Sequence, residues 1–420
     1  MLLETKEKKM KQKTKYQYSY FIYPYIIEEE KYERYLLKLL RDKHCKLKIW
    51  EREKDFNIYT YFLPKVREYL FWSFSYSKEK KRKLEELEVK MKSTLLAKYP
   101  CTMFEYTLGE EIQGKVGEAN GIFFDIQKIE IVCFQTGICF LLLKTTVEGE
   151  NNFSDVLNFN YKFRDINSEF ISLKNYENIR LQTNAFKDMK ELSTVIKGIT
   201  GSNKEAKEMN LEKERFLTYS YVCLDDMERK LEEEDFSDLK EEFVKFSNIL
   251  PSNYQVNYSE ERYRKQIWQP LKYTRMGFTK QGTVLLTTTS YPENYTKLPF
   301  AFEKEYLYTY LLTLYKKIYL KKMNLEFKKG KKTRKFQKAK EQFLDFTSNV
   351  WIQEITEDEE GCRLHKKWKE TLELEYLYAE TKNQYEMIYK DLTIGVTRKI
   401  NYFLMAVLVG TLLFVMFHWL

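Results

Sequence analysis

The chain has 420 residues, of which 32% are charged and 43% are apolar. This composition excludes a protein made mainly of membrane spans, and the length is sufficient for two or three domains with a sizeable core. The formal net charge of +9 indicates an anionic partner, either lipid or a phosphate-bearing ligand, or else a solvated basic surface.

Residues 1–298 mix strand and helix patterns. A basic tail, residues 1–15, precedes a segment rich in aromatic and β-branched residues. In chain order we predict a strand at 16–27, a helix at 28–42, strands at 46–50 and 56–62, a helix from Pro64, a helix at 78–99, a hairpin of 122–134 and 138–147, a helix at 155–165, a strand at 215–224, a helix at 227–246, and strands at 271–278 and 283–289. The sequence therefore predicts a mixed α/β (α+β) cytoplasmic body over residues 16–298.

From Pro299 onward the pattern becomes helical. We predict a long aromatic helix at 300–327, a second helix at 335–349, a break at 351–361, and a last helix from about Cys362 towards the membrane. These elements predict a helical stalk domain over residues 299–399.

The last stalk helix carries a heptad seam, in which apolar and aromatic residues alternate in steps of four and three. Two interpretations remain open: a parallel stalk around an oligomer axis, or packing on the two preceding helices of the same chain. The seam consists of Leu374, Tyr378, Thr381, Tyr385, Ile388, Leu392 and Gly395.

Residues 400–420 contain no charged residue and follow Arg398 and Lys399 directly. As a helix this segment is about 31 Å long, which matches a hydrocarbon core of about 30 Å, and we predict a transmembrane helix. Basic residues beside a span favour the cytoplasmic side, so we expect a single-pass protein of the cell membrane with the bulk of its chain in the cytoplasm. If the seam continues into the span, the predicted pore-lining residues are Tyr402, Ala406, Val409 and Leu413.

Basic residues are clustered in the N-terminal tail, at 78–83, and most densely near Gly330. The last cluster is the predicted site for anionic lipid or a nucleotide or oligonucleotide ligand, with a solvated surface as the alternative. It consists of Lys328, Lys329, Lys331, Lys332, Arg334 and Lys335.

The sequence offers no catalytic motif. Its histidines, His44, His365 and His418, have no zinc-site spacing to a cysteine, and no phosphate-binding or nucleophile-elbow motif occurs. We therefore predict no enzyme activity, no metal site and no cofactor.

The C-terminal third resembles CorA-like proteins, relatives of the CorA-type magnesium transporters. The resemblance rests on the order of two helices, TSNVWIQEITEDEEGCRLHKKW (347–368), LELEYLYAETKNQYEMIYKDL (372–392) and an apolar helix. The Gly-Met-Asn signature and a second span are missing, so no ion-selecting residue is carried over. The resemblance implies a ring-like homo-oligomer whose spans line a pore, in the manner of membrane effectors of bacterial antiphage defence that respond to nucleotide signals.

The leading interpretation is a homo-oligomeric membrane protein whose cytoplasmic domain gates an ion channel. Two alternatives lack a pore: a tail-anchored scaffold, and a membrane-tethered nucleic-acid-binding protein. The last of these depends on the basic residues at 328–335 and predicts binding that weakens steeply with salt.

Overall fold

The computed structural model describes residues 12–109, 111–117, 121–149, 152–166, 179–183, 188–201, 215–227, 236–257, 259–329 and 333–419. The chain divides into two compact units. The first comprises Met1–Tyr315 and Gln353–Leu372, and the second comprises Lys316–Ile352 and Glu373–Leu420. The predicted stalk, residues 299–399, is therefore shared between both units.

A 12-stranded sheet forms the centre of the first unit. Its strands are β1 (Thr14–Ile26), β2 (Cys45–Leu47), β3 (Cys101–Tyr106), β4 (Ile112–Val116), β5 (Ile122–Phe134), β6 (Ile138–Val147), β7 (Ile179–Thr183), β8 (Lys190–Glu191), β9 (Leu217–Leu224), β10 (Ile267–Trp268), β11 (Thr274–Thr279) and β12 (Gly282–Thr288). The order is β10-β11-β12-β9-β1-β6-β5-β4-β7-β8, with β3 paired to β5 and β2 paired to β3. β9 and β12 run parallel, and the other strand pairs within the described residues are antiparallel. The mixed α/β body predicted from the sequence is confirmed.

The predicted hairpin is confirmed as β5 and β6. Gly137 in its turn has φ of 82°, and a Cβ there would lie 2.0 Å from the carbonyl oxygen of Ile27. The Gly137 carbonyl also accepts a hydrogen bond of 2.8 Å from the Ile27 backbone N–H. Glycine is therefore required here both by the backbone conformation and by the close approach of β1's end.

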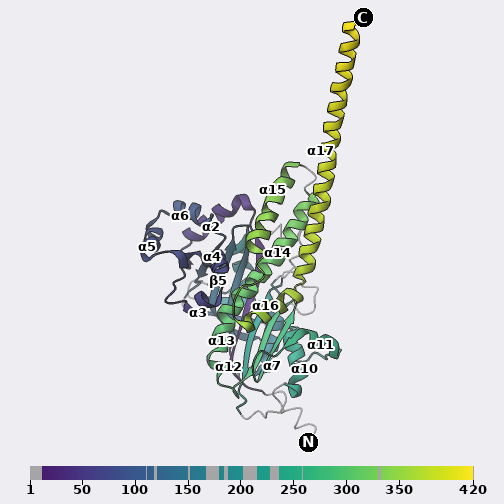
Figure 1. Cartoon of the computed structure of the whole chain (residues 1–420). Helices are drawn as coiled ribbons and strands as arrows, with labels where there is room; N and C mark the ends of the chain where they lie inside the picture. Colours follow the sequence, from purple (N-terminus) through teal and green to yellow (C-terminus); the bar gives the residue numbers. More distant parts are fainter. Residues whose placement is uncertain are drawn as a thin grey trace. The chain divides into compact units, whose positions relative to one another are not determined.

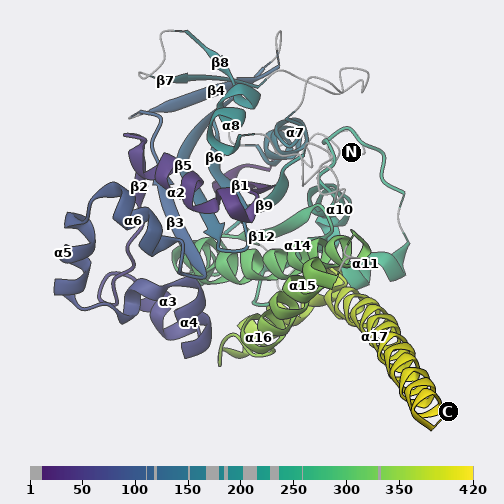
Figure 2. The same ribbon diagram turned by 90° about the horizontal axis from the view of Figure 1, so that it is seen from above.

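Helices pack beside the sheet within the first unit (Figure 1). In Figures 1 and 2, α2 to α6 gather beside β3, whereas α10 and α11 lie at the β11–β12 end. The α-helices are α2 (Tyr32–Arg41), α3 (Phe56–Tyr61), α4 (Pro64–Leu70), α5 (Lys78–Glu86), α6 (Val89–Leu96), α7 (Phe153–Phe163), α8 (Leu192–Thr200), α10 (Lys240–Ser247), α11 (Glu260–Gln266), α12 (Glu293–Thr296), α13 (Leu298–Ala301), α14 (Leu307–Lys329), α15 (Thr333–Asp345), α16 (Glu359–Thr371) and α17 (Leu374–Trp419). Shorter turns are η1 (Glu29–Lys31), η2 (Trp72–Ser75), η5 (Ser237–Leu239) and the π-helical η6 (Phe302–Tyr306) and η7 (Phe346–Val350).

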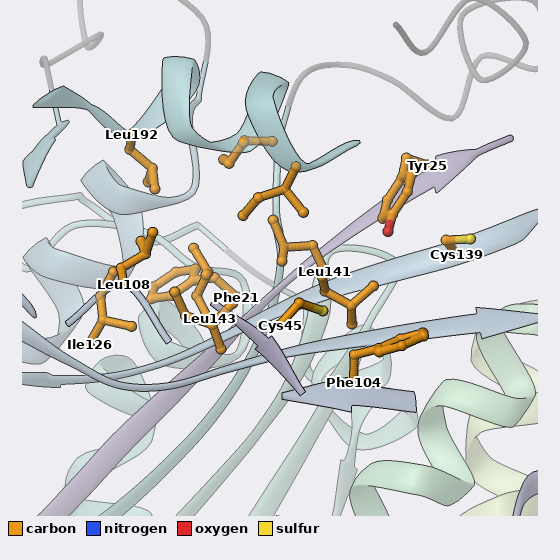
Figure 3. Close-up of a cluster of buried hydrophobic side chains, with 14 of the residues drawn as sticks. Phe21, Tyr25, Cys45, Phe104, Leu108, Ile126, Cys139, Leu141, Leu143 and Leu192 are labelled. Atoms are coloured by element: carbon orange, nitrogen blue, oxygen red, sulfur yellow. The ribbon is translucent and has the colours of Figure 1, made fainter. Parts of the chain in front are cut away.

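The main hydrophobic core lies between one face of the sheet and helices α2, α7 and α8. Phe21 of β1 and Leu141 and Leu143 of β6 are central members, with Leu192 from α8 above them (Figure 3). Alternate residues along β1 face opposite sides of the sheet, so the odd-numbered Phe21 and Tyr25 enter this core.

The even-numbered tyrosines of β1 hold the segment that leads into α14. Tyr18 donates a hydrogen bond of 2.7 Å to the Pro299 carbonyl, and Tyr20 donates one of 3.0 Å to Glu303 Oε1. On the neighbouring strand β9, Tyr219 donates one of 2.9 Å to the Phe302 carbonyl. These buried hydroxyl groups thus fix the start of α14 to the sheet.

Four predicted elements are wrong in type or length. Of the predicted helix 227–246, residues 228–235 lie outside the described residues, Phe236 has φ of 56°, and α10 begins only at Lys240. Residues 56–62 form helix α3 rather than a strand, because only Ile58 and Phe62, which are four residues apart, are buried, while Phe56 is 57% exposed. An extended residue, Leu87, divides the predicted helix 78–99 into α5 and α6. The last helix is divided into α16 and α17 at Glu373, whose φ is 57°.

The second unit is built on stacked aromatic side chains. The ring of Tyr319 on α14 stacks on Phe346 with 4.4 Å between centroids, and Phe327 lies 6.0 Å from Phe336 of α15. Tyr385 of α17 stacks on Phe336 with an interplanar angle of 12°. The last part of α14, α15 and the first part of α17 therefore share one aromatic core.

Candidate functional site: the apolar C-terminal helix

The most distinctive feature of the chain is α17, one uninterrupted helix of 46 residues (Figure 1). Its second half, Thr397–Trp419, has a mean hydropathy of 2.2 over its most apolar window, and none of that window is buried. At about 1.5 Å per residue these 23 residues span about 35 Å, which is sufficient to cross a hydrocarbon core of about 30 Å. Among the described residues this is the one helix long and apolar enough for a membrane span.

Two of the polar groups inside this apolar segment have local contacts. Thr411 donates a hydrogen bond of 2.8 Å to the Leu408 carbonyl, and the His418 ring stacks on Phe414 with 5.4 Å between centroids. A threonine bonded to its own helix carries little cost in lipid. Arg398 and Lys399 are exposed at the start of the segment, where a membrane surface would meet them.

The predicted pore-lining residues lie on one face of α17. Tyr402, Ala406, Val409 and Leu413 follow each other in steps of four and three, and all four are exposed. Because this face is apolar, it is suited to an apolar constriction or to contact with lipid.

The first part of the predicted seam faces its own chain. Leu374 and Thr381 are fully buried, and the ring of Tyr378 stacks on Trp351 with centroids 4.3 Å apart. Tyr385 contacts Phe327, Phe336 and Phe343. Ile388 is half-buried, whereas the burial of Leu392 and of Gly395 is not described.

Sequence reasoning did not find a second stripe on the stalk part of α17, on the side away from these contacts. It consists of Tyr376, Met387 and Ile394, which are 69%, 61% and 50% exposed. A search for residues 18 positions apart, about five helical turns, would have found it, because Ile394 follows Tyr376 by 18 residues. We call Tyr376, Met387 and Ile394 the outer stripe.

The predicted anionic site near Gly330 lies mostly outside the described residues. Lys328 is exposed at the end of α14, while Lys331 and Lys332 are not described. Lys329, Arg334 and Lys335 belong to α14 and α15. This predicted anionic site therefore stays a prediction, because most of its side chains lie outside the described residues.

The basic cluster on α5 is described, and part of its charge is locally neutralised. The Lys83 ammonium lies 2.6 Å from Glu79, and Arg82 lies 3.4 Å from Glu86. Lys81 donates a hydrogen bond of 2.8 Å to the Trp50 carbonyl. These contacts are typical of a solvated helix face.

A buried ion cluster lies on the face of the sheet that carries α14. The Glu130 carboxylate lies 2.7 Å from Lys48 Nζ and 3.1 Å from Lys128 Nζ, and the Tyr308 hydroxyl is 3.3 Å away. Burial alone would raise the pKa of Glu130, but the two ammonium groups outweigh this effect and lower the pKa to about 2. Glu130 is therefore ionised at neutral pH although its side chain is only 4% exposed.

A second buried carboxyl group has the opposite behaviour. Burial raises the pKa of Glu305 to about 7, with Asp358 adding to the effect and Lys304 opposing it. Glu305 is 8% exposed, and its Oε2 atom has no hydrogen-bond partner. Glu305 belongs to the π-helical turn before α14, so its ionisation would place a charge at a buried position of that turn.

The first unit contains a cavity of about 290 Å³ beside α10 and α11. Its described lining residues combine side-chain amides and tyrosine rings, and none of these described residues is charged. Carboxamides form paired hydrogen bonds with base edges, and aromatic rings stack on bases. The lining residues are Val244, Asn248, Leu250, Tyr254, Gln255, Val256, Asn257, Tyr263, Gln266 and Gln281.

Within the described part of the chain, no group of three or more His, Cys, Asp and Glu residues is placed to hold a metal ion. The six cysteines are free thiols, of which Cys362 is exposed and the others are buried. A comparison with known proteins found no match: no family model, no curated protein and no solved structure is similar to this chain.

Proposed function

We propose that this chain is a single-pass membrane protein, that its copies associate through α17, and that their spans form a gated ion-conducting pore. The observation that carries this proposal is the continuity of α17. One helix begins among the packed rings of Trp351, Tyr378 and Tyr385 and continues through the apolar segment Thr397–Trp419. A tilt or rotation at its packed base is therefore transmitted to the span without an intervening hinge.

A pore requires several copies, because one helix cannot enclose a channel. The span offers lipid-like side chains around its circumference, so the pore would close by losing water at an apolar constriction. Arg398 and Lys399 favour a cytoplasmic body as the controlling domain.

The test has two parts. Protein purified in a mild detergent is expected to have the mass of an oligomer, and the same protein in a planar bilayer is expected to produce discrete current steps. Protein that stays monomeric in the detergent contradicts the proposal, and so does an oligomer that never conducts.

As the controlling signal we propose an anionic nucleotide. The net charge of +9 favours phosphate groups, and the described, uncharged lining residues of the 290 Å³ cavity suit a base. Titration with nucleoside triphosphates and short oligonucleotides is expected to raise the melting temperature of the protein, and Tyr263→Ala is expected to reduce that rise. A melting temperature unchanged by all of these ligands contradicts a nucleotide signal.

Signal-controlled ion leakage would stop the growth of an infected cell, and we therefore place this channel among effectors of antiphage defence. Expression of the chain with its neighbouring genes is expected to lower phage plaque counts. The loss of protection on replacement of the span by an unrelated apolar helix would connect that effect to the pore.

The second candidate is a membrane-anchored scaffold without a pore. It is favoured by the first part of the seam, where Leu374, Tyr378 and Thr381 are already packed within the chain. An anchor needs only apolar length, so an unrelated span should preserve its function.

A further inference from the structure

We infer that the outer stripe of α17, made of Tyr376, Met387 and Ile394, is the surface through which two copies of this chain associate in parallel. This inference rests on the proposed self-association and names the face that performs it. It differs from the sequence-based prediction, which assigned the contact between copies to the seam.

The first part of the seam is already packed against residues of the same chain. Thr381 is fully buried, and Tyr378 and Tyr385 stack on Trp351 and Phe336 of the same chain. A side chain that is packed within its own unit cannot also form the contact with a second copy. The seam between residues 374 and 385 is therefore unavailable for the contact between copies.

The residues of the outer stripe lie on one side of α17. At about 100° per residue, Tyr376, Met387 and Ile394 lie within about 20° of one line, which also carries the exposed Asn383. This line is roughly opposite the fully buried Thr381 and the partly buried Tyr385. These three residues precede the candidate span, which begins at Thr397, so lipid does not account for their exposure. Large apolar side chains aligned on an exposed helix face indicate a protein contact.

The partner that fits the outer stripe is a second copy of this chain. The same line continues into the span through Met405 and Leu412, which follow Met387 and Ile394 by 18 residues each. Copies inserted in one bilayer have the same direction and depth, so the stripe of one copy lies level with the stripe of the next. A second copy of this chain therefore meets the stripe along its whole length.

The charges beside the stripe are complementary in such an arrangement. Lys390 lies on one flank, and Glu380 and Asp391 lie on the other, each within roughly 60° of the stripe. When parallel helices are related by rotation, the flank of one copy faces the opposite flank of the next. Lys390 then approaches Asp391 of the neighbouring copy at nearly the same depth.

The test is cross-linking of single cysteines in native membranes, with Cys362→Ser as the background because Cys362 is the exposed cysteine. Met387→Cys and Ile394→Cys are expected to give covalent dimers with a mild oxidant or a short bis-maleimide. Thr393→Cys is the matched control, because Thr393 is exposed, adjacent to Ile394, and about 100° away around the helix. Cross-linking that is equal or stronger at Thr393, or absent at both outer-stripe positions, overturns the inference.

A charge exchange gives an independent measurement. Lys390→Asp is expected to reduce the dimer yield of Met387→Cys about twofold, the size expected for an exposed ion pair, and Lys390→Asp with Asp391→Lys is expected to restore it. A yield that the single variant leaves unchanged, or that the exchange does not restore, contradicts the charge pairing. Cross-linking at the outer stripe without any conductance would contradict the proposed pore and support this interface. Conductance with cross-linking only at Thr393 would support the pore and contradict the interface.

Discussion

The ring of Tyr378 on α17 lies almost parallel to the indole of Trp351, with 4.3 Å between centroids and 11° between planes. The Tyr378 hydroxyl also lies 3.4 Å from Thr347 Oγ1 in η7. This stack joins the base of α17 to the turn that follows α15. It fixes the orientation of α17 at its base.

Loss of the stack should loosen the base of α17. We expect Tyr378→Ala to destabilise the second unit by about 2 kcal/mol, because a largely buried aromatic ring is removed and a cavity remains. Hydrogen exchange of the backbone amides of residues 374–385 should rise several-fold. Lys382→Ala, an exposed position on the same helix, is the control, and equal exchange in both variants would contradict the structural role of the stack.

Glu305 should make the stability of the first unit depend on pH. The pKa of Glu305 is raised from 4.5 to about 7 in the folded protein, so the folded state holds this proton more tightly than the unfolded state. Its contribution is therefore fully present below pH 4.5 and is lost as the pH rises to about 7, with a total change of about 3 kcal/mol. Denaturant titrations at pH 5 and pH 8 measure this change.

Glu305→Gln keeps the shape of the side chain and removes its titration. This variant should reduce the difference between pH 5 and pH 8, whereas Glu261→Gln, at an exposed carboxyl group, should leave it unchanged. If Glu305→Gln retains the full pH dependence, another group is responsible for it.

The ion cluster around Glu130 should respond differently to single and double substitutions. Lys48→Met removes the nearest partner of a buried, ionised carboxylate and should cost about 3 kcal/mol. Lys48→Met with Glu130→Met should recover most of this loss, because no buried charge is then left without its partner and the Lys128 side chain, 34% exposed, reaches water. Additive losses in the double variant would show that the two residues act independently.

The sequence predicted the elements whose pattern is local. The hairpin of β5 and β6, strand β1 and the long apolar helix follow from alternation, turn chemistry and hydropathy, and each is present. Residues 56–62 have the composition of a strand. Contacts with the surrounding elements, which the sequence does not show, determine that Ile58 and Phe62 are the two buried residues of this segment. The break between α16 and α17 could not be predicted, because Glu373, which has the positive φ, is neither glycine nor proline.

The candidate site was predictable only in part. Hydropathy identified the candidate span, and heptad spacing identified the packed stalk residues Leu374, Tyr378, Thr381 and Tyr385. The spacing does not specify whether the partner of Tyr378 and Tyr385 is another copy or the rings of α14, α15 and η7. Glu305 and Glu130 had no distinguishing sequence context, because the shifts in their pKa values depend first on burial, and then in part on Asp358 and Lys48, which are distant in the chain.

The seam and the outer stripe are two alternative faces of α17 towards an oligomer axis, and they predict different effects of neighbouring substitutions. If the outer stripe faces the axis, Leu412→Ser should wet the constriction and raise the open probability of the channel several-fold, while Leu413→Ser should have a smaller effect. The seam-based prediction reverses this order, because it places Leu413 with Tyr402, Ala406 and Val409. Single-channel recordings of the two variants distinguish the two faces.

The most direct test of the central claim is the conductance of the purified full chain in a planar bilayer, beside a variant whose residues 400–419 are replaced by an unrelated apolar helix of equal length. We expect discrete current steps for the natural chain and no current steps for the variant with the replaced span, although both proteins insert equally into the membrane. A natural chain that inserts and assembles but carries no current, or a replaced span that conducts as well as the natural one, would contradict it.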